Sequence, residues 1–320
     1  MPALCSTVPP KYVNGRDEMD AAVLGGKLGK IIPAPAVVLE EEPRKPMWSR
    51  KVFVGGLPLQ VLDEELVRVF GPFGSFSIFR PSQSTSFQSR CYCFLVFEKA
   101  VDVERMLGAL ETTAGGFFAD LWAGNRMVKV QVRPFDVLDS KYVPNPQRAV
   151  DLRYTVFLGG IARTTRACEL AAAFAQFGDV AGVSVDLDPE QLYPRGTARV
   201  FFSGSTGYTR AMRHKMVQME ANGETKTYEI KPFVYDNYCD HCFSRLVVHQ
   251  KARYFCGAVS CLSYYCDVCW EQVHKGMRSS HRPFNKGALG SGSVKAIQRP
   301  PSLFVSLEQQ MSRPPPMFPH

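Results

Sequence analysis

The chain has 320 residues, enough for two or three domains, and its formal net charge is +8. Its hydrophobic content of 45% and charged content of 21% are ordinary for globular protein. No apolar run approaches the ~20 residues of a membrane-spanning helix, and the N-terminus lacks the basic-then-apolar order of a signal peptide. We therefore expect an intracellular protein without membrane contact, whose ten cysteines stay reduced.

The two ends of the chain are rich in proline and lack periodic patterns. Residues 1–50 contain a glycine-rich patch and an acidic trio, Glu40 to Glu42, and no periodicity lasts three helical turns. Residues 287–320 include Pro300-Pro301 and Pro314 to Pro316. We expect a disordered leader over residues 1–50 and a disordered tail over residues 287–320.

Regular structure is expected to begin at Lys51, and the elements after it alternate in a recognisable order. KVFVGGLP predicts a strand with Phe53 on its outward face. The pattern then predicts a helix over 64–70 capped by Asp63, a strand over 75–79, a polar loop over 81–89, a strand over 90–97, a helix over 99–110, a long glycine-rich insert and a strand over 127–132. This order, βαββαβ, is a split βαβ unit of the ferredoxin-like type, so the fold class is α+β.

The stretch RCYCFLVF, Arg90 to Phe97, has two different faces when it is read with the period of a strand. One face is apolar, and the other presents a cation and two rings, from Arg90, Tyr92 and Phe94. The pattern fits the RNP1 strand of an RNA-recognition motif, with Val52 to Leu57 as RNP2. Exposed rings on a flat sheet can stack on unpaired bases. The alternative is an ordinary buried strand with aromatic residues on both sides.

The same pattern occurs a second time along the chain. VFLGGI, Val156 to Ile161, matches VFVGGL at an offset of 104 residues, and RGTARVFF, Arg195 to Phe202, matches RCYCFLVF at an offset of 105. Helices over 169–177 and 207–219 and strands over 180–187 and 227–231 complete the unit. Two matches with the same internal spacing predict two RNA-recognition motifs, over residues 51–135 and 154–235.

The second copy differs at the outward positions of its RNP1 strand. Thr197 and Arg199 stand where the first copy has Tyr92 and Phe94, while Phe157 remains on the RNP2 strand. Arg199 can stack through its guanidinium or bond to bases and phosphates; a solvated surface arginine is the alternative. The first domain is therefore the expected main platform. The predicted RNA-binding residues are Phe53, Arg90, Tyr92, Phe94, Phe157, Arg199, Lys51, Lys129 and Phe135.

The charge distribution bears on how these domains would hold a nucleic acid. Residues 51–135 carry a net charge of only +1 and residues 136–238 carry none, whereas residues 239–320 hold 10 basic and 4 acidic residues, a net +6. Stacking and local basic residues must therefore carry RNA binding in the middle of the chain. The linker, residues 136–153, follows Phe135 and contains Leu138 and Tyr142, which we expect to pack against the sheets; a disordered spacer is the alternative.

A cluster of cysteines and histidines follows the second domain. Its members are Cys239, Cys242, Cys256, Cys261, Cys266, Cys269, His274 and His281. Eight such ligands suit two tetrahedral, structural zinc ions in a segment too small to bury its own core. Cys239, Cys242, Cys266 and Cys269 most simply share one ion and the other four residues the second, a cross-braced arrangement over residues 236–286. Other pairings stay open, with His241 and His249 as spare ligands, and three disulfides in a secreted module are the alternative.

Two RNA-recognition motifs, followed closely by a cluster of six cysteines and two histidines, resemble the cytoplasmic polyadenylation element-binding (CPEB) protein family. KVFVGGLP, FLVFE, QVRPFDVLDSKYV, TVFLGG, GTARVFF and CDHC…YFC…C…YYCDVCW carry the resemblance between about Lys51 and Pro283. Arg199 matches a recurring arginine of that family's second domain. The resemblance identifies the cluster as a ZZ-type zinc-binding domain that contacts proteins and assists RNA binding.

If the resemblance holds, it implies a non-enzymatic regulator of translation and poly(A) length, acting in germ cells and early development. The tandem domains would bind single-stranded U-rich elements in mRNA 3′ untranslated regions, as a monomer. Translation and polyadenylation or deadenylation factors would be its protein partners, and its location cytoplasmic, with shuttling to the nucleus also open. The rival hypotheses are a protein-interaction adaptor and a RING-type ubiquitin ligase. The second is unlike this chain, because a RING domain ends with a Cys-x2-Cys pair and this cluster ends with two histidines.

Overall fold

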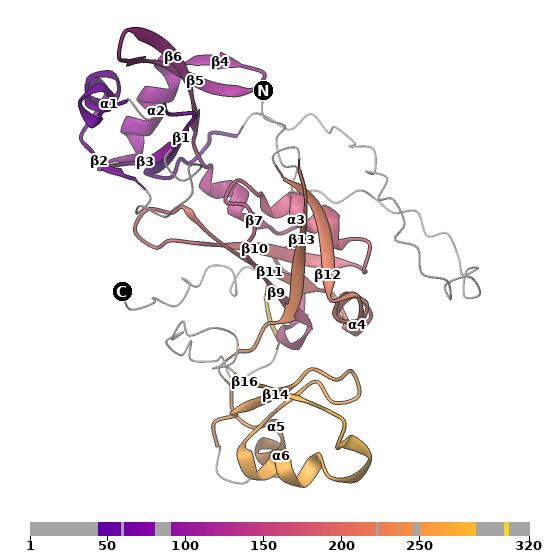
Figure 1. Cartoon of the computed structure of the whole chain (residues 1–320). Helices are drawn as coiled ribbons and strands as arrows, with labels where there is room; N and C mark the ends of the chain where they lie inside the picture. The colour runs from indigo at the N-terminus through magenta and orange to yellow at the C-terminus, as the bar shows by residue number, and fades with distance from the viewer. Residues whose placement is uncertain are drawn as a thin grey trace, which may run out of the picture.

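A computed structural model describes residues 44–58, 61–80, 91–221, 224–235, 237–245, 250–285 and 304–306. Three units follow one another along the molecule: a sheet with helices in indigo and magenta, a second such sheet in the middle, and a small orange and yellow unit (Figure 1). Within these residues, no helix is both long and apolar enough to cross a membrane.

The first unit is an α/β layer built on the expected βαββαβ order. Its elements are β1 (Lys51–Gly55), α1 (Asp63–Phe70), β2 (Phe76–Phe79), β3 (Tyr92–Phe97), α2 (Ala100–Ala109), β4 (Glu111–Thr113), β5 (Gly116–Ala123) and β6 (Arg126–Arg133). The antiparallel sheet has the order β2-β3-β1-β6-β5-β4. Leu66 and Phe70 of α1 are fully buried against Cys93, Leu95 and Phe97 of β3, so the apolar face of RCYCFLVF forms the core, as the alternation predicts.

Two local features of this unit differ from what the pattern predicts. The glycine-rich insert after α2, for which the pattern predicts no element, contains β4 and β5, and these strands form a hairpin that extends the sheet beyond β6. Its alternating residues Ala119, Leu121 and Ala123 are buried, which gives the strand an inward face. Asp63 is the first residue of α1 rather than its N-cap, since Leu62 occupies the N-cap position without a side-chain hydrogen bond.

The second unit repeats the arrangement. Its elements are β9 (Thr155–Gly159), α3 (Ala167–Phe174), β10 (Val180–Leu187), β11 (Pro194–Phe202), α4 (Ser205–His214), β12 (Met216–Ala221) and β13 (Glu224–Pro232). The helix predicted over 207–219 ends early, at His214. Lys215 adopts a left-handed conformation (φ 60°) that stops the helix, and Val217 and Met219 then alternate into the core from β12. Two βαββαβ domains in an α+β protein are thus confirmed.

The segment between the two domains belongs structurally to the second. It contains helical turns at Val137–Ser140 and Leu152–Tyr154, β7 (Lys141–Tyr142) and β8 (Ala149–Asp151). β7 pairs with β10, which gives the second sheet the order β12-β13-β9-β11-β10-β7. Val150 and Leu152 pack against Ala181 and Phe201 on the outward face of this sheet. The linker therefore covers part of the face that carries the RNP strands.

Both predicted disordered ends need correction where the structure describes them. In the predicted leader, Ser49 is fully buried and its hydroxyl donates to the Gln191 carbonyl (2.7 Å), while Trp48 forms a β-bridge with Asp136. In the predicted tail, β17 (Phe304–Ser306) pairs antiparallel with β8. Backbone hydrogen bonding to the linker explains both corrections. Residues 1–43 of the leader, the rest of the tail and the predicted loop 81–89 lie outside the described residues.

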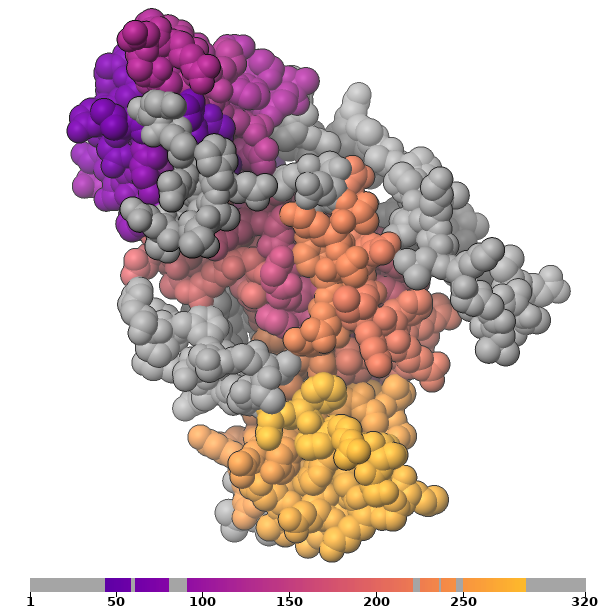
Figure 2. Space-filling view, in the orientation of Figure 1, coloured from indigo at the N-terminus to yellow at the C-terminus, as the bar shows by residue number. Residues whose placement is uncertain are grey.

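The third unit is small and joins the core of the second domain. It comprises α5 (Asp240–Ser244), β14 (Tyr254–Cys256), β15 (Ser263–Tyr265), α6 (Asp267–Val273) and β16 (Pro283–Asn285), with the sheet order β15-β14-β16. Its buried Phe255 and Tyr264 pack in one cluster with Tyr208 of α4. The Tyr264 hydroxyl also accepts a hydrogen bond from the Tyr235 backbone (3.0 Å). In the space-filling view this unit lies directly against the second domain (Figure 2).

Candidate nucleic-acid interface and metal centres

Four outward side chains form a straight line across the first sheet, here called the first row. Strand register places Phe79 of β2 opposite Phe94 of β3, Phe94 opposite Phe53 of β1, and Phe53 opposite Arg133 of β6. Residues directly opposite one another in an antiparallel sheet share a face, so the three rings are adjacent. Phe79 is 51% exposed. The guanidinium carbon of Arg133 lies 5.8 Å from the centroid of the Phe53 ring.

The three aromatic side chains predicted to stack on bases lie together. The ring centroids of Phe53 and Tyr92 are 5.3 Å apart and nearly parallel, at 29°. Phe94 stands edge-on to both rings, 5.7 Å from Phe53 and 5.8 Å from Tyr92. All three are only partly buried on the side of the sheet away from the core. Rings in this arrangement offer π-faces to unstacked bases.

The predicted cations of this domain have different surroundings. The Lys51 ammonium lies 4.6 Å from the Phe94 ring centroid, and its burial lowers the pKa of this lysine below the usual value. Lys129 is on the hairpin beyond the rings, where it pairs with Glu111 and, at 3.4 Å, with Asp120. Both carboxylates compete with any phosphate for this lysine. Arg90 lies outside the described residues.

A ring from the second domain packs against Phe94 of this platform. Tyr193, in the turn before β11, lies with its ring centroid 5.7 Å from Phe94 and 6.2 Å from Phe135. It is 5% exposed, and this burial raises its pKa to about 12. The Arg50 guanidinium donates to the Glu190 carbonyl (2.7 Å) beside it. Phe135, predicted to contact RNA, is itself buried in this contact between the domains.

The corresponding line across the second sheet, here called the second row, has a different composition. The register places Lys141 opposite Ser184, Ser184 opposite Arg199, Arg199 opposite Phe157 and Phe157 opposite Lys231. The five residues come from β7, β10, β11, β9 and β13 in that order. One aromatic ring and one arginine occupy the centre, and a lysine stands at each end.

Arg199 lies on the predicted face of the sheet, but its side chain is buried. It is 7% exposed, its Nε donates to Asp186 Oδ1 (3.2 Å), and its Nη2 lies 3.4 Å from the Ser184 hydroxyl. Thr197, the other outward residue of RNP1, donates its hydroxyl to Asp186 Oδ2 (2.8 Å). The alternative of a solvated surface arginine is therefore wrong. The guanidinium is held in one orientation by neutralising and polar partners.

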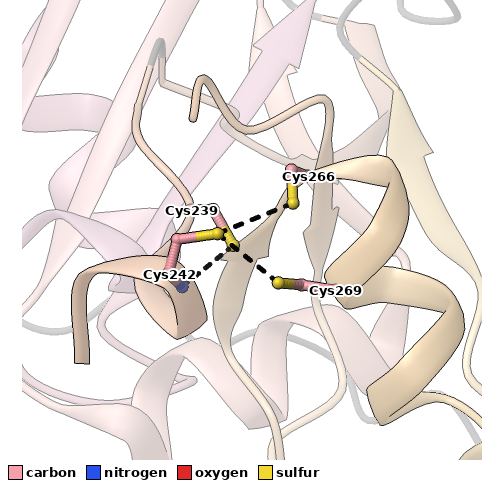
Figure 3. Close-up of side chains that lie close together, drawn as sticks. All are labelled: Cys239, Cys242, Cys266 and Cys269. Carbon is pink, nitrogen blue, oxygen red and sulfur yellow. Dashed lines mark hydrogen bonds between the residues drawn. The ribbon is translucent and has the colours of Figure 1, made fainter. Parts of the chain in front are cut away.

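Four of the predicted metal ligands meet between the two short helices of the third unit. Cys239, Cys242, Cys266 and Cys269 are all buried, with their sulfur atoms within 4.8 Å of one another (Figure 3). Cys239 and Cys266 stand at the N-caps of α5 and α6. The Cys242 backbone N–H lies 3.5 Å from the Cys239 sulfur, as a donor that favours the thiolate form. The geometry suits a closed metal site made by four cysteine thiolates.

The other four predicted ligands meet at a second point. Cys256, Cys261, His274 and His281 have ligand atoms within 4.8 Å of one another. Cys256 Sγ is 3.5 Å from His281 Nδ1, and Cys261 Sγ is 3.6 Å from His274 Nε2. The Trp270 carbonyl lies 3.2 Å from His274 Nδ1, a partner that would leave Nε2 free to bind a metal. A hydrogen bond with Cys256 is the first cause that lowers the pKa of Cys261 to about 4.

The structure thus brings the eight ligands together in the two alternating sets that the spacing favoured. His241 belongs to neither set, and His249 lies outside the described residues. The predicted set missed three aromatic residues near the sheets, Phe79, Tyr193 and Phe233. It also missed three cations of the two rows, Arg133, Lys141 and Lys231. A signal existed for Phe79, since the alternation of FSIF directs Phe76 and Ile78 inward and Phe79 outward. Tyr193 and Phe233 lie outside the RNP strands, and no periodic pattern marks them.

Two family patterns match parts of this chain. The family pattern described as "RNA recognition motif" matches residues 49–134, and the one described as "Cytoplasmic polyadenylation element-binding protein ZZ domain" matches residues 226–287. Together with the two sheets, these matches define the class: an RNA-recognition-motif protein with a ZZ-type zinc-binding domain.

Curated relatives of known name point to one family. "Cytoplasmic polyadenylation element-binding protein 1" of Caenorhabditis briggsae is 38% identical over 280 residues, which cover 80% of this chain and 47% of that protein. "Translational regulator orb2" of Drosophila melanogaster is 35% identical over 248 residues, or 75% of this chain and 35% of that protein. The chain belongs to the cytoplasmic polyadenylation element-binding protein family. It spans about half the length, or less, of the curated relatives it matches.

Solved structures resemble this chain only distantly. The "SXL-LETHAL PROTEIN/RNA COMPLEX" has 17% identity and a TM-score of 0.23, with 58% of this chain and 99% of that chain covered. The Caenorhabditis elegans NONO-1 homodimer has 22% identity and a TM-score of 0.24, with coverages of 60% and 66%. At these scores the similarities support no statement about how this chain binds its ligand.

Proposed function

We propose that this chain binds single-stranded U-rich elements in mRNA 3′ untranslated regions, and through them regulates translation and poly(A) length. The observation that carries the proposal is the cluster of outward rings of Phe53, Tyr92 and Phe94 on the first sheet. The names of the relatives, a polyadenylation element-binding protein and a translational regulator, support the choice of messenger RNA.

Stacking supplies most of the affinity in this proposal. A base stacked on an aromatic ring contributes about 1–3 kcal/mol, so two or three stacked bases account for a large part of a specific affinity. The net charge of residues 51–135 is only +1, which leaves few phosphate contacts to add. Lys51, beside Phe94, and Arg133, beside Phe53, are placed to take those contacts. The first sheet is then the main platform and the second sheet extends it.

The third unit holds two structural zinc ions in the proposal. Cysteine sulfur and histidine nitrogen are the ligands zinc prefers, and each cluster supplies four of them. A tetrahedral ion with four protein ligands keeps no position for a reacting water, so the sites stabilise the fold and the protein is not an enzyme. The ions replace the hydrophobic core that so short a segment lacks.

The same unit is the proposed contact for protein partners, translation and polyadenylation or deadenylation factors. Phe243 of α5 and Val268 of α6 are 60% and 58% exposed, and apolar side chains at such positions suit a partner surface. We place the protein in the cytoplasm, with shuttling to the nucleus as an option, and as a monomer on RNA. Fractionation and sedimentation of the RNA complex test these two assignments.

The proposal is tested by titrating the full chain with U-rich and with C-rich RNA at fixed salt, and then repeating both titrations with Tyr92→Ala plus Phe94→Ala. We expect tighter binding of the U-rich RNA and a loss of about 2–4 kcal/mol in the double variant, the contribution of about two stacked bases. Equal affinity for both RNAs refutes base selectivity, and unchanged affinity in the double variant refutes stacking on these rings. For the metal, native mass measurement should give two zinc ions per chain.

A further inference from the structure

Phe233 is an aromatic residue of the second domain that lies outside its RNP strands but close to their outward side chains. Phe233 follows β13, and its ring centroid lies 6.3 Å from that of Phe157, with 39° between the planes. The guanidinium carbon of Arg199 lies 5.5 Å from the centre of the Phe233 ring. Phe233 therefore stands beside the centre of the second row, where the first domain has its rings and the second RNP1 strand has Thr197 and Arg199.

The position of Phe233 is fixed by the chain on both sides of it. Its backbone N–H donates to the Thr155 carbonyl (3.0 Å), which continues the pairing of β13 with β9. The Tyr235 ring packs edge-on against Phe233 at 4.7 Å, and its hydroxyl lies 3.4 Å from that of Thr155. The backbone of Tyr235 in turn donates to Tyr264 of the zinc-binding unit. The ring is thus held in place by the second domain and, through Tyr235, by the zinc-binding unit.

The charges along the second row match a nucleic-acid strand that crosses the sheet. Lys141 and Lys231 stand at opposite ends of the row, with Arg199 and Phe157 between them. Lys141 is exposed, and Lys231, 42% exposed, pairs with Glu229 at 2.9 Å. An exposed pair of this kind is weak, so Lys231 can exchange its partner for a phosphate. Arg199 is already paired with Asp186, so its guanidinium is less available to phosphates. It lies over the Phe233 ring instead.

We propose that Phe233 and Phe157 form a base-stacking subsite of the second domain, with Lys141 and Lys231 binding the flanking phosphates of single-stranded RNA. Arg199 lies beside this subsite, and its fixed positive charge favours the electron-rich faces of the rings and of a base. The linker strand β7 widens the sheet for this purpose by adding Lys141. The inference rests on the proposed RNA-binding function and deepens it, because it gives the second sheet an aromatic site of its own.

A purely structural role for Phe233 is the competing explanation: the ring would only cover Arg199 and Asp186. The two roles respond differently to substitution. Leucine retains an apolar cover of similar size but has no π-face, while tyrosine retains both. A cover tolerates Phe233→Leu, whereas a stacking ring does not.

The test uses the full chain and a fluorescently labelled oligouridylate of about 12 nucleotides, a length that spans both sheets at the usual site sizes for single strands. Binding is followed by anisotropy. We expect Phe233→Leu to weaken binding about tenfold, the effect of one lost stack, and Phe233→Tyr to bind within about twofold of the original. Val101→Ala, at an exposed apolar residue of α2, is the control and should bind unchanged.

Salt dependence tests the phosphate contacts. Lys141→Gln should make the slope of log K against log salt about 0.7 shallower, the effect of one phosphate on single-stranded nucleic acid. Lys99→Gln, an equal charge change just before α2, should leave the slope unchanged. If Phe233→Leu unfolds the domain, Phe233→Trp provides a second measurement. Stacking of a base on the introduced tryptophan should quench the fluorescence of that residue when RNA is added.

The outcomes separate this inference from the function it rests on. Original affinity in Phe233→Leu, or no added quenching in Phe233→Trp, overturns the subsite; if Tyr92→Ala plus Phe94→Ala still weakens binding, the proposed function stands. Failure of the original chain to bind the oligouridylate refutes the proposed function itself.

Discussion

The two sheets present the same backbone row with different chemistry. The first row reads Phe79, Phe94, Phe53 and Arg133, and the matching positions of the second read Ser184, Arg199, Phe157 and Lys231. The three ring positions of the first domain thus hold one serine, one arginine and one ring in the second, while the fourth position is a cation in both. Two copies of one fold place side chains at equivalent positions, but the residue types at those positions can differ. One copy can therefore contribute mainly stacking and the other mainly charge.

The sheets also differ in what surrounds them. The first sheet's outward face meets the second domain at Phe94, which contacts Tyr193 and, at 5.9 Å from the ring centroid, the Arg163 guanidinium. Part of the second sheet's outward face is covered by the linker, and its opposite side shares a core with the zinc-binding unit. The second domain therefore depends on its neighbours for folding more than the first does. This difference leads to the largest predicted effect.

Removal of the metal should destabilise the second domain and spare the first. A strong chelator removes about 10–16 kcal/mol of apparent binding free energy per structural zinc, enough to unfold the third unit. Phe255 and Tyr264 would then leave the cluster around Tyr208. We expect hydrogen exchange to accelerate in α4 and β14, while β1 and β3 keep their protection. Uniform loss of protection in both domains, or no loss in α4, would contradict the shared core.

The next effect in size separates the two RNA surfaces. Tyr92→Ala plus Phe94→Ala should cost about 2–4 kcal/mol of RNA-binding free energy, and Phe157→Ala only about 1 kcal/mol, because the second row has fewer rings. Tyr92→Ala alone is the control for the contact between domains, since of the two substituted rings it is Phe94 that contacts Tyr193. Equal losses in the two domains, measured by titration with the same RNA, would remove the asymmetry.

A smaller effect, on folding, is expected at the buried ion pair of the second row. Arg199→Met leaves the carboxylate of Asp186, whose side chain is 15% exposed, with only the Thr197 hydroxyl. We expect a loss of about 2 kcal/mol in the free energy of unfolding, as for other charges left buried without a partner. Adding Asp186→Asn should recover part of it. Urea unfolding gives the free energy of unfolding of both variants. If Arg199→Met is as stable as the original chain, the Arg199–Asp186 pair contributes no more than a weak surface ion pair.

The smallest effect concerns the ring at the end of the first row. Phe79→Ala should weaken RNA binding by about 1 kcal/mol, the lower limit for one stacked base, without a change in the melting temperature. Val67→Ala, an exposed apolar residue on α1, is the matched control. An unchanged affinity would show that Phe79 does not contact the RNA, and that only Phe94, Phe53 and Arg133 of the first row can do so.

Alternation along the strands made much of this structure predictable. The strand 180–187 agrees residue for residue with β10, and the inward face of RCYCFLVF is the core of the first domain. Ligand spacing likewise predicted the two metal clusters, because the close cysteine pairs stand at the starts of two short helices and meet across the segment between them. Local periodicity and spacing are enough for both results.

What sequence patterns missed depends on contacts between distant parts of the chain. The burial of Ser49 comes from Gln191, 142 residues away, and Tyr193 reaches Phe94 only because the two domains pack together. Phe233 is positioned by Thr155 and, through Tyr235, by the zinc-binding unit. None of these contacts leaves a periodic signal.

The central claim is that rings, more than charges, hold the RNA, and the salt dependence of binding tests it most directly. Four cations at the rows, Lys51, Arg133, Lys141 and Lys231, predict about four phosphate contacts and a slope of log K against log salt near −3 for single-stranded RNA. We expect Tyr92→Ala plus Phe94→Ala to lower K by a constant factor at every salt concentration and to keep that slope. A slope steeper than about −6, which needs more than eight phosphate contacts, together with unchanged affinity in this variant, would contradict the account.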